Sequence, residues 1–140
     1  MGFETRCEWI PPSLHAGHVR EEDGHACMLA LWEAEEKPDA LIVTDDIMAK
    51  GVCQAILQLG VRVPADLAMV THANSDSGIF YPFPMPCIEF DVPECARKAG
   101  ELLLDLLADP NLPPREIILH PVLRLPDGLS IAPPLEREEA

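Results

Sequence analysis

The chain has few basic residues. Of its 140 residues, 10 are lysine or arginine and 24 are aspartate or glutamate, which gives a formal net charge of −14. Nucleic-acid binding needs clustered basic side chains that neutralise phosphates, so the sequence argues against direct contact with DNA. No apolar run approaches the ~20 residues of a membrane helix, and no signal peptide opens the chain. We therefore expect a cytoplasmic protein that does not enter a membrane.

Motifs of enzyme active sites are also missing. The sequence contains no nucleophile elbow, Walker A loop or dinucleotide fingerprint. Its five cysteines are odd in number and show no CxxC spacing, which favours reduced thiols over a disulfide framework or a zinc site. We therefore expect a protein without catalytic activity, a bound metal or an organic cofactor.

The segment 37–73 predicts a strand, a helix and a second strand. Ala40–Thr44 is a short β-branched run of the kind buried in a parallel sheet, and Leu67–Thr71 is another. Between them, Asp45 or Asp46 is placed to cap a helix, and Gly60 supplies the left-handed residue that ends it. The inward face of this helix is predicted at four apolar positions, Met48, Val52, Ile56 and Leu59.

Four polar residues follow these two strands. A strand-helix-strand unit with parallel strands crosses over right-handed, so Asp45, Asp46, His72 and Asn74 are all expected near one edge of the sheet. Open α/β sheets bind small molecules at this edge. Two interpretations stay open. The four side chains bind a ligand, or one aspartate only caps the helix while His72 and Asn74 serve local turn structure.

Two further helices are predicted on either side of this unit. The first, Glu21–Glu35, has a mostly small apolar face at Ala26, Cys27, Ala30, Leu31 and Ala34. The second, Val92–Ala108, begins after Asp91 as its cap, and its buried stripe is predicted at Cys95, Ala99, Leu102, Leu103 and Leu106.

The remaining segments predict strands, a loop and a tail. Strands are expected at Thr5–Ile10 and at Ile117–Leu125, where Pro121 interrupts the ladder. The loop 73–86 is too apolar for a free linker, so part of it should pack against other residues or a second subunit. Residues 131–140 are expected to be a mobile tail.

The order of these residues resembles the effector-binding domain of the LacI/GalR family of bacterial transcription regulators. Family members carry a strand ending in Ala-Asn-Asp, then Met-Ala-x-Gly in a helix, then Gly-Leu-x-Val-Pro-x-Asp. The matching runs here are Thr44-Asp45-Asp46, Met48-Ala49-Lys50-Gly51 and Gly60-Val61-Arg62-Val63-Pro64-Ala65-Asp66. Gly24 also falls where the family has Ser-Gly-Tyr in the preceding helix. The resemblance extends more loosely from about Glu21 to Ser130.

The resemblance implies an α/β domain, with a parallel sheet flanked by helices, like one lobe of a type I periplasmic-binding-protein-like fold. Residues 1–130 would be the C-terminal part of that ligand-binding domain, with 92–125 belonging to the other lobe. In the family a small-molecule effector, usually a sugar or nucleobase, binds between the lobes without catalysis. The subunits form dimers. DNA is bound by an N-terminal helix-turn-helix, which we do not find in this sequence.

This sequence departs from the family at two positions of the expected ligand site. Asp45 stands where the family normally has Asn, and Ala73 stands where a family Asp commonly contacts the effector. Two other functions are weighed against the regulator. A sugar solute-binding protein of a transporter shares the fold, whereas metal-assisted hydrolysis at Asp45 and Asp46 lacks a third ligand and a base.

Overall fold

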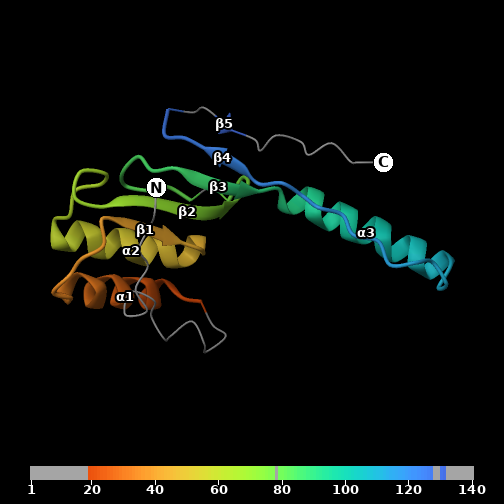
Figure 1. The fold of residues 1–140 in the computed structure, drawn as a ribbon, viewed down its shortest axis with the longest axis horizontal. Coiled ribbons are helices and arrows are strands. Elements are labelled where there is room, and N and C mark those ends of the chain that lie inside the picture. The colour runs from red at the N-terminus through yellow and green to blue at the C-terminus, as the bar shows by residue number, and fades with distance from the viewer. Residues whose placement is uncertain (1–18, 78, 128–129, 132–140) are drawn as a thin grey trace.

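The structure, a computed structural model, describes residues 19–77, 79–127 and 130–131. One sheet contains β1 (Ala40–Val43), β2 (Ala68–Asn74), β3 (Cys87–Phe90), β4 (Val122–Arg124) and β5 (Ser130–Ile131), in that order across the sheet (Figure 1). β1, β2 and β3 are parallel, whereas β4 and β5 are each antiparallel to the preceding strand. The predicted α/β class is confirmed, but the sheet is mixed rather than wholly parallel.

The C-terminal strand is shorter than predicted. A strand was expected over Ile117–Leu125, but β4 contains only three residues, because Pro121 has no N–H for the ladder and pairing begins just after it. Ile131 was expected at the start of a mobile tail. It lies instead in β5, where it pairs with Leu123 of β4. The predicted strand Thr5–Ile10 and residues 132–140 lie outside the described residues.

Local signals define both ends of α2 (Asp46–Leu59) as predicted. Asp45 is the N-cap, and Gly60 ends the helix with a left-handed φ of 69°. Of the four predicted inward residues, Met48, Val52 and Ile56 are buried. The fourth, Leu59, is exposed, because the chain turns at Gly60 and Val61 packs against the core instead.

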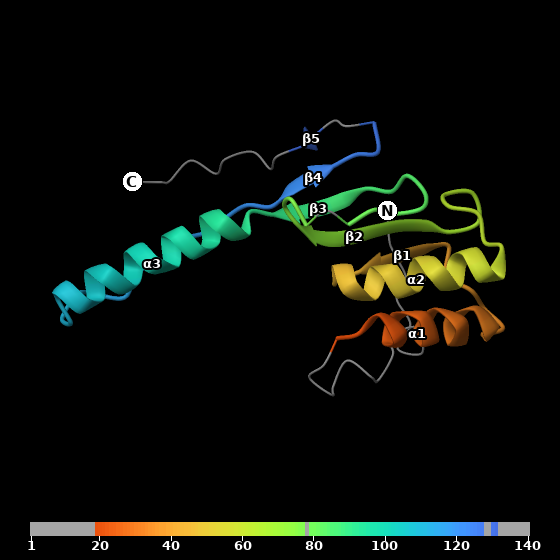
Figure 2. The ribbon, with the colours of Figure 1, turned by 180° about the vertical axis from the view of Figure 1, so that it is seen from behind.

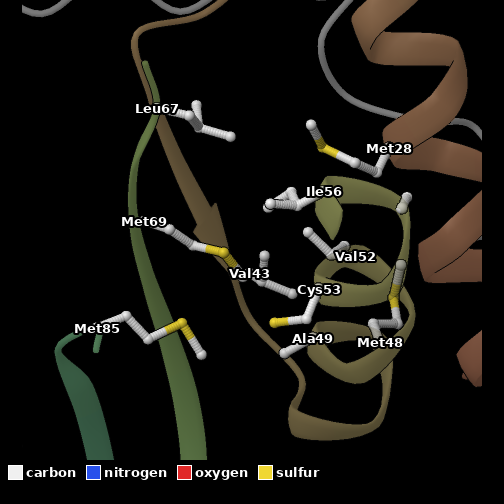
Figure 3. Close-up of a cluster of buried hydrophobic side chains, with 11 residues drawn as sticks. Met28, Val43, Met48, Ala49, Val52, Cys53, Ile56, Leu67, Met69 and Met85 are labelled. Atoms are coloured by element: carbon white, nitrogen blue, oxygen red, sulfur yellow. The ribbon is translucent and has the colours of Figure 1, made fainter. Parts of the chain in front are cut away.

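The hydrophobic core lies between the sheet and α2. Figure 3 shows side chains from β1, β2 and the loop before β3 directed towards the inner face of α2, with Met28 of α1 on another side of Ile56. On β2 the buried positions alternate, so Met69, Thr71 and Ala73 face the core while the residues between them face away. The opposite face is more open, and Ile42 on β1 is 67% exposed there.

Helix α1 (Glu21–Glu33) packs on α2 rather than directly on the sheet (Figures 1 and 2). The two helices cross at glycines: a Cβ added at Gly24 would lie 2.2 Å from the Met48 carbonyl oxygen, and one at Gly51 would lie 1.8 Å from the Glu21 carbonyl oxygen. Both glycines of the sequence motifs therefore permit backbone contact.

This crossing also changes the predicted inner face of α1. The predicted members Ala26 and Ala30 are exposed, whereas Gly24 and Met28 are buried. Cys27 and Leu31 are half-buried against the core, as expected. The orientation of α1 follows its two close approaches to α2, at Gly24 and at Glu21 opposite Gly51, and not the centre of its small apolar face.

Helix α3 (Val92–Ala108) extends away from the rest of the molecule, and the chain then returns beside it to β4 (Figures 1 and 2). Its predicted bounds are confirmed, and Asp91 caps it by accepting a hydrogen bond from the Glu94 amide at 2.8 Å. The predicted buried stripe is wrong, because no residue of α3 is buried. The leucines form an apolar face that the described chain does not cover, and Leu107 is 70% exposed.

The apolar loop before β3 was expected to pack in part against other residues, and it does so against its own chain. Met85 is buried, and Tyr81 and Phe83 contact the core, whereas Phe80 is 89% exposed.

No helix in the described part of the chain has the length and apolar character to cross a membrane.

Candidate ligand-binding edge of the sheet

The four predicted site residues lie at the carboxyl edge of the parallel strands. In the register between β1 and β2, Val43 pairs with Thr71. Asp45 and Asp46 follow Val43 within three residues, and His72 and Asn74 are among the last three residues of β2. The backbone therefore brings all four to one edge, while their side chains differ in what they contact.

Asp45 is committed in part to the start of α2. Its Oδ1 accepts hydrogen bonds from the amides of Ile47 at 2.9 Å and Met48 at 3.0 Å. These are orphan donors of the first helical turn, and a negative charge there is also favoured by the helix dipole. Of the two aspartates predicted as possible caps, Asp45 is therefore the one that caps α2. Asp46 is the first helical residue and is half-buried.

His72 lies on the face of the sheet that points away from α2. Its ring meets the ring of Phe90 edge-on, with 5.0 Å between the ring centroids and 71° between the planes. Such edge-to-face pairs contribute about 0.5–1.5 kcal/mol beyond their buried area. Phe90 was missed by the sequence analysis, because only the pairing of β2 with β3, His72 opposite Ile88 and Asn74 opposite Phe90, brings the two rings together.

Asn74 ends β2, and its side chain is exposed. Its backbone carbonyl accepts a hydrogen bond from the Ser77 amide at 3.1 Å, while the Ser75 amide donates to the Phe90 carbonyl at 2.8 Å. Asp76, which lies between Ser75 and Ser77, has a positive φ of 59°. The turn thus presents Asn74 at the rim of the edge. Its neighbour Ala73 is buried on the other face and offers no polar group.

Two hydroxyl groups lie beneath the edge, on the side of α2. The Thr71 hydroxyl, fully buried, donates to the Val43 carbonyl at 3.1 Å and so links β2 to β1. The Tyr81 hydroxyl is buried and makes no hydrogen bond of good geometry with the described residues, although the Thr71 side chain interacts with it and lowers its pKa a little. Burial raises the pKa of Tyr81 to about 12, with smaller contributions from Cys87 and Asp46. The hydroxyl is therefore a neutral donor at pH 7.

The edge as a whole offers both acceptors and donors. Carboxylate oxygens of Asp45 and Asp46 accept, and the Asn74 amide both accepts and donates, whereas the Tyr81 hydroxyl is buried beneath them. Among residues 19–77, 79–127 and 130–131, no three His, Cys, Asp or Glu side chains come together as a metal site. This set suits hydrogen bonding to a neutral polar molecule.

Comparison with known proteins places this architecture in a family. Residues 3–130 match the family described as "Periplasmic binding protein-like domain". The chain therefore belongs to the periplasmic binding protein-like domain family. Within it, the chain corresponds to part of the effector-binding domain of LacI-type transcriptional regulators, which confirms the resemblance found in the sequence.

The relatives behind this assignment are transcriptional regulators. The chain is 32% identical over 120 residues to the HTH-type transcriptional repressor PurR of Mannheimia succiniciproducens, which covers 86% of this chain and 35% of the repressor. It thus spans about a third of that relative's length. A LacI family regulator from Lactobacillus casei with bound sucrose is 25% identical, with a TM-score of 0.62, over 76% of this chain and 40% of the regulator. A LacI family regulator from Arthrobacter sp. FB24 in complex with lactose is 26% identical, with a TM-score of 0.60, over 71% and 36%.

Proposed function

We propose that this chain is the effector-binding and dimerisation portion of a LacI-type transcriptional regulator that senses a sugar-like molecule in the cytoplasm without catalysis. The observation that carries the proposal is the meeting of Asp45, Asp46, His72 and Asn74 at the carboxyl edge of a parallel sheet in a chain of this family. Bound sucrose and lactose in two related regulators support a sugar as the ligand.

The roles of the site residues follow from their surroundings. The Asp45 oxygen that does not cap α2, and the Asp46 carboxylate, accept hydrogen bonds from ligand hydroxyls. Asn74, exposed at the rim, both accepts and donates. His72 and Phe90 form an aromatic wall beside it. Ala73 has no polar side chain at a position where family members commonly have an Asp that contacts the effector. Binding at this site therefore depends more strongly on Asp46 and Asn74.

The remaining apolar surface supports self-association. Phe80 stands almost fully exposed beside the core, and the leucines of α3 are uncovered. Exposed apolar side chains that gather on one face, as the leucines of α3 do, mark contacts with other protein surfaces. We expect a homodimer or larger oligomer, and we place 92–125 with the second lobe of the complete domain. With a net charge of −14, the chain itself should not bind DNA.

The experiment is a calorimetric titration of sucrose and lactose into the native chain and two matched variants. Asp46→Ala removes a carboxylate at the proposed edge, whereas Asp39→Ala removes one at the other end of β1. Loss of one charge-assisted hydrogen bond costs about 1.5–3 kcal/mol, so Asp46→Ala should weaken binding at least tenfold. Asp39→Ala should bind as the native chain does.

Equal affinity in both variants would contradict the assigned site, and absence of heat with every sugar would contradict sugar sensing. The alternative of a solute-binding protein of a transporter has the family description in its favour. It predicts the same titration but association with a transport complex instead of a DNA-binding regulator. Metal-assisted hydrolysis is the weakest alternative, because no third metal ligand lies near Asp45 and Asp46 in the described chain.

A further inference from the structure

The segment that projects from the sheet is attached at a single place. This arm consists of α3 and residues 109–121, which leave the sheet after β3 and return to it at β4 (Figures 1 and 2). The residues next to its two junctions are neighbours, because Glu89 of β3 pairs with Val122 of β4. With no residue of α3 buried, packing contributes little to the direction of the arm.

The arm is held together internally. Arg115 on the returning chain forms an ion pair with Asp105 of α3 at 2.5 Å. At the tip, Asp109 accepts a hydrogen bond from the Asn111 amide at 3.0 Å, which closes the turn back along the helix. These contacts make the arm a unit, so a change in its direction would be concentrated at the junction with β3 and β4.

An ion pair joins β3 and β4 next to that junction. The guanidinium of Arg124 on β4 donates to both carboxylate oxygens of Glu89 on β3, from Nε to Oε1 at 2.8 Å and from Nη2 to Oε2 at 2.7 Å. Glu89 is mostly shielded, with 19% of its side chain exposed. Its bond to Arg124 also raises the pKa of the guanidinium. A two-point contact of this kind fixes orientation as well as distance.

We propose that the Glu89–Arg124 pair is a clamp that fixes the direction of the arm relative to the sheet. β3 and β4 share only three residue pairs, from Cys87 with Arg124 to Glu89 with Val122. So short an antiparallel ladder leaves freedom to twist. The clamp crosses the ladder diagonally and opposes that twist. Because 49% of the Arg124 side chain is exposed, solvent weakens the pair and it adds little to overall stability. Its effect should therefore appear in geometry more than in melting temperature.

The test measures the distance between α2 and the tip of the arm. Ketone-bearing residues placed at the exposed positions Lys50 and Ala108 carry spin labels, which avoids the five native cysteines. Pulsed electron resonance is recorded on the full chain with unlabelled chain in excess, so that distances between copies are suppressed. We expect one narrow distance distribution for the native sequence, and a broadened or shifted one for Glu89→Gln and for Arg124→Gln.

The matched control is Arg97→Gln, which breaks ion pairs with Glu94 and Glu101 on the surface of α3, away from the junction. It should leave the distribution narrow. Exchanging the charges, with Glu89→Arg and Arg124→Glu together, should restore it, and circular dichroism confirms that each variant is folded. An unchanged distribution in folded Glu89→Gln and Arg124→Gln, or equal broadening by Arg97→Gln, would overturn the proposal. If Glu89→Gln unfolds the chain, the charge-exchanged pair decides: a narrow distribution supports the clamp, and a broad one contradicts it.

Discussion

Alanine at Gly51 is the sharpest perturbation of this fold. Its Cβ would lie 1.8 Å from the Glu21 carbonyl oxygen and 2.7 Å from the His25 amide nitrogen, both backbone atoms of α1. Real Cβ contacts essentially never fall below 3.0 Å, so α1 would have to withdraw by about 1.2 Å, the difference between 3.0 and 1.8 Å. No side-chain rotation can relieve this overlap.

The expected loss follows from two opposing effects. Overpacking that displaces the backbone costs about 1–3 kcal/mol, and here it also separates Met28 from Ile56, both fully buried. Alanine in a helix recovers about 1 kcal/mol relative to glycine. Taking the upper end of the overpacking cost and subtracting the gain from helix propensity gives a net loss of about 2 kcal/mol in the free energy of unfolding. For a chain of this size that lowers Tm by roughly 6–10 °C.

Gly100→Ala is the matched control. Gly100 lies within α3, and a Cβ there would meet no atom within 4 Å. The same substitution should therefore raise stability by about 0.5–1 kcal/mol through helix propensity alone. Both variants are compared by thermal and urea unfolding followed by circular dichroism. A Gly51→Ala chain as stable as the native protein would refute the close crossing of α1 and α2.

Three further predictions concern single side chains. Asp45→Ala should cost about 1 kcal/mol in urea unfolding, because two amides lose their acceptor, whereas Asp45→Asn should cost only a few tenths; equal losses would show that charge alone matters. Tyr81→Phe should leave stability unchanged or raise it by up to about 1 kcal/mol, since the buried hydroxyl makes no hydrogen bond of good geometry with the described residues. A marked loss would show that its interaction with Thr71 stabilises the fold. Burial raises the pKa of Cys53 to about 11, so mass spectrometry after brief iodoacetamide treatment of the folded chain at pH 7 should find Cys53 unmodified and the exposed Cys95 modified; rapid modification of Cys53 would indicate opening of the core.

The elements that were predicted well are those with local end signals. Asp45 and Gly60 bound α2, and Asp91 with Pro93 opens α3, because caps depend on residues adjacent in sequence. The inner face of α1 was not predicted well, since Gly24 adds nothing to a hydrophobic pattern although its missing side chain decides the packing. For α3, periodicity identified the apolar face but carries no information about which chain covers it.

The candidate site shows the same division. Parallel strand topology was enough to predict that Asp45, His72 and Asn74 share an edge. Which aspartate caps the helix depends on where the first helical turn begins, and both residues were compatible with the sequence. The contact between His72 and Phe90 depends on the register of β2 with β3, which no local pattern encodes.

The central claim is that this chain binds a small molecule at the carboxyl edge of its parallel strands. The most direct measurement is a nuclear magnetic resonance titration of the isotope-labelled chain with sucrose and lactose, following every assigned amide. We predict concentration-dependent shifts centred on Asp45, Asp46, His72 and Asn74, with the amides of α1 and the tip of α3 unaffected. Shifts confined to the exposed face of α3, or none at saturating sugar, would contradict it.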